Sequence, residues 1–394
     1  MARGLRDRVA IVAMGCTPFR EHWDRSADDL LVDAVTECLD GAPGVALDDV
    51  EAFWVGTQGS GMSGQTLAKP LGLRGKPVTR VENYCATGSE AFRNAAFAVA
   101  SGAYDVVMAT GVEKLKDSSF SGLTATWPPS DGTDVEWTAP GGFSLLAPAY
   151  RERYGITEAD LRDALTHIAY KNHANGALNP KAQFRKAVSK EAIARSPRIA
   201  GSLSVMDCSG VADGAAAALI VRAEDAHRYT DRPVFLKGMG FVAGPGDGLT
   251  TDGYDFTTFP EVVQATAEAY AQAGVTSPRD QIDLAEVHDC FTPTELVLME
   301  DLGFAERGRA WADVLDGVFD RDGKVAVNPD GGLKSFGHPV GATGLRMFYE
   351  CFLQLRGEAG ERQVPDARLA VAQNLGGQPG SCVAFTAVIG NEGP

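Results

Sequence analysis

Residues 81–113 read VENYCATGSEAFRNAAFAVASGAYDVVMATGVE, and this stretch indicates the fold class. A single cysteine, Cys85, precedes a run of small residues typical of a tightly packed helix, and the last nine residues read as a buried strand. Strand and helix patterns also alternate earlier in the chain, where residues 8–19 and 50–58 are expected to form strands and residues 27–42 a helix. Strands that alternate with helices predict a layered α/β protein.

The second half of the chain repeats this pattern. A strand is expected at 282–291, a helix at 342–358 and two strands within 368–390. Between the halves, a loop-like composition leads into a helix for which Thr157 is a suitable N-cap. We therefore expect an N-terminal half at 1–113, a C-terminal half at 236–394, and a loop or insertion region at 114–235 that also returns to the N-terminal half.

Charge and composition narrow the class of protein. The chain has 394 residues, of which 44% are hydrophobic, and its net charge is −16. This charge disfavours nucleic acid and anionic membrane as partners. No charged leader with an apolar core and no long apolar run is present, so we expect a cytoplasmic protein. The seven cysteines form no CxxC pair, which argues against a disulfide framework and a structural metal.

Cys85 is the first candidate for chemistry. A helix N-terminus carries partial positive charge and unpaired N–H groups, which favour a thiolate and stabilise a developing oxyanion. These are the requirements of a nucleophile. The other interpretation is that Cys85 is a small buried hydrophobe.

Two histidines lie in other unusual stretches. In EVHDCF, His288 and Cys290 are two residues apart on an expected strand, so their side chains would share one face. In GGLKSFGHPVGATG (331–344), His338 lies in a rigid glycine- and proline-rich turn before a helix. A structural role for either histidine stays open at this point. The glycines of this second stretch do not form a nucleotide-binding loop, because residues 331–344 contain neither GK[ST] nor GxGxxG.

Together these stretches resemble the thiolase family, in the branch of the sterol-carrier-protein-linked thiolases. The resemblance covers essentially the whole chain, and its most specific motifs are GHPxGATG and HDCF. It implies a five-layered αβαβα thiolase fold with duplicated halves and an inserted loop domain. The other matching stretches are NYCATGSEAF, KNHANGALNPKAQF (171–184), DCSGVADGAAAALIV (207–221) and NLGG (374–377).

The resemblance also implies roles for individual residues. Cys85 would be the nucleophile that carries the acyl group, and His338 would accept its proton. Cys290 would be the second acid/base, because Asn374-Leu375-Gly376 replaces the Cys-x-Gly of the commoner thiolases. His288 and His338 would form one oxyanion site, and the backbone N–H groups of Cys85 and Gly376 the other.

The implied ligands are coenzyme A and acyl-CoA, bound as substrates with no permanent cofactor. Ala243 and Gly244, in a stretch similar to the family's pantetheine loop, are expected to contact CoA, as are His173 and Lys181 of the insertion. Loop region 114–150 would shape the acyl pocket, and no pattern in this region indicates which acyl chain the pocket takes. A homodimer or homotetramer is expected, and a small partner protein is possible.

The implied reaction is CoA-dependent cleavage of a 3-ketoacyl-CoA, or the reverse Claisen condensation. One alternative is a thiolase-like retro-aldolase of sterol side-chain breakdown that works with a partner protein. A β-ketoacyl synthase also uses one cysteine and two histidines, but the thiol of HDCF argues against it. A non-catalytic scaffold subunit that binds acyl-CoA is a third alternative.

Overall fold

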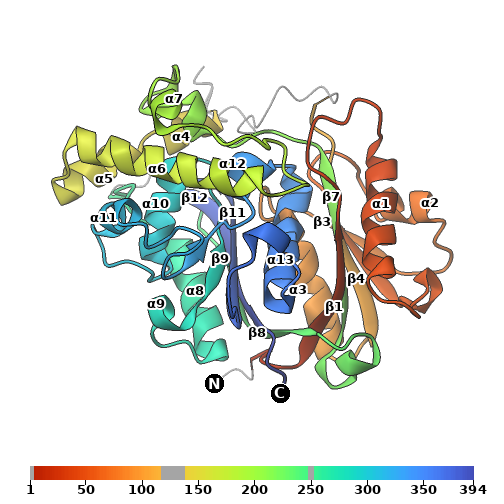
Figure 1. The fold of residues 1–394 in the computed structure, drawn as a ribbon. Helices are drawn as coiled ribbons and strands as arrows, with labels where there is room; N and C mark the ends of the chain where they lie inside the picture. Colours follow the sequence, from red (N-terminus) through yellow and green to blue (C-terminus); the bar gives the residue numbers. More distant parts are fainter. Residues whose placement is uncertain (1–3, 117–137, 247–252) are drawn as a thin grey trace.

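The computed structural model describes residues 4–116, 138–246 and 253–394 (Figure 1). Its main feature is one ten-stranded sheet with the strand order β10-β9-β11-β12-β8-β1-β7-β4-β2-β3. A separate two-stranded sheet contains β5 (Arg198–Ala200) and β6 (Leu203–Ser204). The strands of the main sheet are β1 (Val9–Cys16), β2 (Ala52–Gly56), β3 (Val78–Val81), β4 (Val106–Glu113), β7 (Gly214–Arg222), β8 (Val234–Ala243), β9 (Leu284–Glu286), β10 (Ala326–Val327), β11 (Leu369–Gln378) and β12 (Ser381–Gly390).

The sheet consists of two halves with the same topology. In the first half, β1, β7 and β4 are antiparallel neighbours, and β2 and β3 continue parallel to β4. In the second half, β8, β12 and β11 are antiparallel, and β9 and β10 continue parallel to β11. The halves meet edge to edge, where Ala10 and Ile11 of β1 pair with Phe235 and Val234 of β8. The predicted duplication is therefore confirmed by strand order and direction.

Helices complete the layers. In the centre, α3 (Thr87–Ala100) and α13 (Val340–Arg356) pack against each other between the two half-sheets, and α1 (Ala27–Asp40) and α8 (Pro260–Ala273) cover the outer faces (Figure 1). The predicted five-layered arrangement is thus confirmed. The remaining α-helices are α2 (Gln65–Leu71), α4 (Ala139–Phe143), α5 (Leu146–Tyr154), α6 (Glu158–Ala177), α7 (Lys190–Ala194), α9 (Pro278–Gln281), α10 (Thr292–Asp301), α11 (Ala310–Leu315) and α12 (Gly332–Phe336).

The expected insertion contributes helix α6, which packs on α10, α11 and α12. Thr157 caps α6 as predicted, because its hydroxyl accepts a hydrogen bond from the Asp160 N–H. The division at 113/114 and 235/236 stays a prediction, and its second boundary falls within β8. Residues 117–137 of the expected acyl-pocket loop lie outside the described residues. No helix in the described part of the chain is long and apolar enough to cross a membrane.

One secondary-structure prediction at the site is wrong. The strand expected over 282–291 ends at Glu286, so His288 and Cys290 lie in the loop between β9 and α10. A tight turn, in which the Asp289 N–H donates to the Val287 carbonyl, ends the strand. The Asp289 carboxylate is then held by the backbone N–H groups of Leu333 and Lys334. Hydrogen bonds to the distant helix α12 therefore override the local strand pattern.

Candidate active site

Cys85 lies in the short connection between β3 and α3. Tyr84 adopts a left-handed backbone conformation with φ +51°, which turns the chain just before the cysteine. Thr87 N–H then donates to the Tyr84 carbonyl, and the helix begins. As the sequence predicts, the cysteine therefore lies immediately before the first helical turn. The structure shows that it is half-buried.

Glycines bring the starts of α3 and α13 into close contact. A Cβ atom at Gly88 would lie 2.9 Å from the Gly341 carbonyl oxygen, and one at Gly344 would lie 2.4 Å from the Ser89 nitrogen. Side chains at either position would therefore push the two helices apart. This close crossing explains the glycines of CATG and GATG, and it places the loop before α13 beside Cys85.

His338 lies in that loop, between α12 and α13. Its backbone N–H donates to the Gly210 carbonyl over 2.7 Å, and its Nδ1 lies 2.7 Å from the Thr343 hydroxyl. The Thr343 hydroxyl donates its own proton to the Pro339 carbonyl, so it accepts a hydrogen bond from His338. The proton of the neutral His338 ring is therefore on Nδ1.

Asn374 of β11 fixes His288 in the same way. The Asn374 amide nitrogen donates to the Cys85 carbonyl over 2.9 Å and to the Ser89 hydroxyl over 3.2 Å. Its oxygen therefore faces His288 and accepts a hydrogen bond from Nδ1 over 2.7 Å. Neutral His288 also carries its proton on Nδ1, which leaves Nε2 as an acceptor.

The three side chains form one cluster. Cys85 Sγ and one ring nitrogen of each histidine all lie within 4.8 Å of one another. The imidazole rings are nearly perpendicular, with centroids 5.4 Å apart. His338 Nε2 is buried and has no hydrogen-bond partner among the described residues. Because both Nδ1 atoms are engaged, each ring presents the lone pair of Nε2 to the site.

Burial keeps all three groups neutral. It lowers the pKa of His288 to about 3 and that of His338 well below its usual value. Although the residue is partly exposed, dense packing raises the pKa of the Cys85 thiol to about 12, with a smaller contribution from the Glu82 carboxylate. Here the expectation from the sequence is wrong, because burial outweighs the helix N-terminus that would favour a thiolate. The resting site holds a neutral thiol beside neutral imidazoles.

Cys290 lies in the loop after β9, next to this cluster. Its residue is 3% exposed, and its Sγ is 3.6 Å from the Thr294 hydroxyl of α10. Burial raises its pKa well above the usual value, and the nearby Cys85 thiol adds to this shift. Cys290 is therefore a protonated thiol at neutral pH, which suits it to donate a proton.

Gly376 packs directly against the backbone of the Cys85 loop. A Cβ atom at Gly376 would lie 2.5 Å from the Asn83 carbonyl oxygen and 2.9 Å from the Cys85 nitrogen. Only glycine therefore fits beside the Cys85 N–H group. The sheet register also places Val383 of β12 between Gly376 and Ala243, so Ala243 lies roughly 10 Å from Gly376 across two strand spacings.

Family models match nearly all of this architecture. The model described as "Thiolase, N-terminal domain" matches residues 9–224, and "Thiolase C-terminal domain-like" matches residues 249–391. The chain belongs to the thiolase family. Among curated relatives of this thiolase, the acetyl-CoA acetyltransferase of Methanothermobacter thermautotrophicus is 38% identical over 389 residues, with 96% of this chain and 98% of the relative covered. Human sterol carrier protein 2 is 33% identical over 392 residues, and 94% of this chain and 70% of the relative are covered.

Solved structures share the thiolase fold. The structure titled "Ltp2-ChsH2(DUF35) aldolase" is similar with a TM-score of 0.83 and 25% identity, over 98% of both chains. The acetyl-CoA acetyltransferase of Syntrophomonas wolfei gives a TM-score of 0.71 at 20% identity, over 98% of this chain and all of that one. The resemblance to thiolases is therefore confirmed, and this thiolase is an acyltransferase by its family.

The four expected CoA contacts fall into two groups. Ala243 is the last residue of β8 and Gly244 follows it, and the Gly244 N–H donates to the Cys382 carbonyl. His173 is buried on α6, where its Nε2 lies 3.1 Å from Lys334 Nζ, and Lys181 Nζ lies 2.6 Å from both Glu37 carboxylate oxygens. Contact of any of the four with CoA stays a prediction.

Reasoning from the sequence missed the residues that orient the thiolase histidines. Asn374 was noticed only as the replacement of a cysteine, and Thr343 only as part of a glycine-rich turn. It also missed Asn172, whose amide nitrogen donates to Asp289 and to Glu295 and so ties α6 to the HDCF loop. The available signal was a polar residue inside a motif. The partners of Asn374 and Asn172 are distant in the chain, so the sequence pattern does not identify them.

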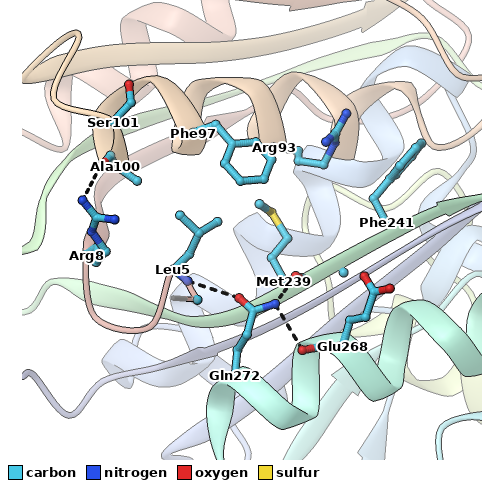
Figure 2. Close-up of a pocket in the computed structure, with 12 residues that line it drawn as sticks. Leu5, Arg8, Arg93, Phe97, Ala100, Ser101, Met239, Phe241, Glu268 and Gln272 are labelled. Atoms are coloured by element: carbon cyan, nitrogen blue, oxygen red, sulfur yellow. Dashed lines mark hydrogen bonds between the residues drawn. The ribbon is translucent and has the colours of Figure 1, made fainter. Parts of the chain in front are cut away.

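The described residues also form a cavity of about 480 Å³, which Figure 2 shows. It is bounded by the C-terminal part of α3, by β8 and by α8, and Arg93, Phe97 and Phe241 line it. None of the five predicted catalytic residues lines it. We therefore assign the chemistry to the Cys85 cluster and not to this cavity.

Proposed function

We propose that this thiolase cleaves 3-ketoacyl-CoA with CoA, or runs the reverse Claisen condensation, through an acyl-enzyme on Cys85. The observation that carries the proposal is the placement of the Cys85 thiol against the Nε2 lone pairs of two neutral histidines. A thiol with a raised pKa needs a base at the moment of attack, and an unprotonated imidazole within reach is that base.

In the first half-reaction, the proton that leaves the Cys85 thiol then serves as a hydrogen-bond donor on His338. His338 Nε2 takes the proton as Cys85 Sγ bonds to the 3-keto carbon, and the resulting Nε2–H is then a donor. Neither histidine offers a donor at Nε2 in the resting site, so the donor forms together with the nucleophile. The Cα–Cβ bond then breaks, and Cys290 donates its proton to the α-carbon that leaves with CoA.

The second half-reaction restores the site. A CoA thiol attacks the Cys85 thioester as its proton passes to the Cys290 thiolate, directly or through His288 Nε2. Collapse of the tetrahedral intermediate releases the shortened acyl-CoA, and the Cys85 sulfur takes its proton back from His338. The close packing of Gly376 on the Cys85 loop supports the predicted oxyanion site between their backbone N–H groups.

For the substrate, we propose that the pantetheine arm approaches past Ala243 and Gly244. Their place in the sheet, two strands from Gly376, supports this path. We also propose that His173 and Lys181 contact CoA. For these contacts to form, His173 must leave its present hydrogen bond and Lys181 its present ion pair.

We further propose that the protein is a homodimer or homotetramer and that it is located in the cytoplasm. The seven free cysteines support the cytoplasmic location.

A retro-aldolase with a partner protein is the second candidate. It is favoured by the structural similarity to the protein titled "Ltp2-ChsH2(DUF35) aldolase". The intact cluster of Cys85, His288 and His338 favours the thiolase, because a retro-aldol cleavage needs no acyl-enzyme.

A thiolysis assay tests the proposal. Loss of 3-ketoacyl-CoA absorbance is followed after addition of CoA, over ketoacyl chains of increasing length, with C85A, C290A and the control C208A. We expect activity in the wild type and C208A, and loss in C85A and C290A. A wild type that cleaves no ketoacyl-CoA, but cleaves a β-hydroxyacyl-CoA by retro-aldol reaction, would contradict the proposal and support the second candidate.

A further inference from the structure

The cluster of Cys85, His288 and His338 also has the composition of a metal site. Among the described residues, it is the only group of three or more cysteine, histidine or acidic side chains whose ligand atoms gather closely, all within 4.8 Å. In a tetrahedral zinc site, sulfur and nitrogen ligands lie about 3.4–3.6 Å apart, as follows from ordinary Zn–S and Zn–N distances. Inward movements of about 1 Å would therefore complete the coordination.

The contacts behind the histidines favour such a site. Metal-binding histidines usually donate their second ring N–H to a protein acceptor, which fixes the ring and directs the other nitrogen to the ion. Here His288 Nδ1 donates to Asn374, and His338 Nδ1 donates to Thr343. His338 Nε2 is fully buried without a partner among the described residues, which is an independent sign of a missing ligand.

The donor set selects the class of ion. One thiolate and two imidazoles suit Zn²⁺ or Co²⁺, whereas Mg²⁺ and Ca²⁺ need oxygen ligands. Three protein ligands leave a fourth position open, and the partial exposure of Cys85 gives water access to it.

We propose that this site binds one Zn²⁺ ion reversibly through Cys85 Sγ and Nε2 of both histidines, and that the ion inhibits the enzyme. On binding, Cys85 loses its thiol proton to solvent, water takes the fourth position, and nothing is oxidised or reduced. The bound sulfur cannot attack a substrate carbonyl carbon, and neither histidine can accept a proton. The inhibitory consequence rests on the proposed function, while the binding rests only on the geometry.

Binding is tested with the full chain and without substrate. Titration with ZnCl₂ by calorimetry should show one ion per chain, and CoCl₂ should produce a thiolate-to-cobalt charge-transfer band. Both signals should be lost in C85S, should weaken at least tenfold in H288A and H338A, and should persist in C208S. Metal binding that is absent, or that is the same in all four variants, would overturn the proposal.

Two further measurements keep the result independent of folding defects and of the proposed function. In the wild type, Zn²⁺ should slow alkylation of Cys85 by iodoacetamide, and a chelator should restore it; unprotected alkylation at saturating Zn²⁺ would overturn the site. In the thiolysis assay, Zn²⁺ should abolish activity reversibly. A protein that binds Zn²⁺ at Cys85 but has no thiolysis activity at all contradicts the proposed function and leaves the metal site standing. An active enzyme that stays active with Zn²⁺ bound contradicts the inhibition.

Discussion

The Asn374 side-chain oxygen accepts a hydrogen bond from His288 Nδ1 over 2.7 Å, while its nitrogen donates to the Cys85 carbonyl over 2.9 Å. One amide thus links the nucleophile loop to the HDCF loop and decides which His288 nitrogen carries the proton. The resemblance described above implies that Asn374 stands where the commoner thiolases have a cysteine. The replacement therefore supplies a positioning residue where a reactive thiol is missing.

Replacing Asn374 should reduce turnover more than substrate binding. We expect N374A to lower kcat by roughly 100-fold with little change in KM, because His288 loses its fixed orientation. N374D should raise the pKa of His288, since a carboxylate beside Nδ1 stabilises the imidazolium. The acidic limb of the kcat–pH profile should therefore move to higher pH. The control is N391A, at an asparagine that holds the carbonyls of Leu355 and Ala367. Unchanged kcat and pH profile in both Asn374 variants would refute the positioning role.

Reactivity of Cys85 should follow the raised pKa. Because burial raises that pKa to about 12, the thiolate fraction should increase about tenfold per pH unit through pH 10. Alkylation by iodoacetamide, measured on the Cys85 peptide by mass spectrometry, should rise accordingly without a plateau. E82Q should accelerate it at any fixed pH, because the Glu82 charge contributes to the raised pKa. A plateau below pH 8 would instead indicate a resting thiolate–imidazolium pair.

The helix crossing should not tolerate a methyl group. G88A would place a Cβ atom 2.9 Å from the Gly341 carbonyl oxygen, and that backbone moves only if α13 moves. We expect a loss of about 1–3 kcal/mol in the free energy of unfolding and a marked loss of activity. The control G141A meets only the Thr138 hydroxyl, at 3.2 Å, and should be nearly neutral. Thermal unfolding and thiolysis rates measure both effects, and a G88A protein with normal stability and activity would contradict this account of the crossing.

A buried arginine should stabilise the loops that carry the histidines. Arg346 of α13 is fully buried and forms ion pairs with Glu286, at the end of β9, and with Asp330, before α12. R346L leaves both carboxylates buried without a cation, so we expect a loss of about 3–5 kcal/mol in unfolding free energy by chemical denaturation. The exposed pair of Arg232 and Glu358 is the control, and R232L should cost at most about 1 kcal/mol. Equal effects of the two substitutions would show that the buried network has no special role.

The sequence predicts the layers of the fold and singles out Cys85, His288 and His338, which the structure brings together, for physical reasons. Alternating strand and helix patterns are local, and GHPVGATG combines a turn, a histidine and a close-packed helix start in one stretch. The HDCF stretch has a local strand pattern but forms a loop, because its shape depends on hydrogen bonds from Leu333 and Lys334 to Asp289. The Asn374 partner of His288 and the neutral state of Cys85 follow from burial and from contacts between distant segments, which local patterns do not encode.

The central claim is an acyl group on Cys85, and peptide mapping after rapid acid quenching tests it most directly. The wild type is mixed with acetoacetyl-CoA in the absence of free CoA, quenched, digested and analysed by mass spectrometry. The account predicts one acetyl group on the peptide that contains Cys85, removed when CoA is added before the quench, and none in C85A. An acetyl group on another residue, or turnover with no acylated peptide under any quench, would contradict it.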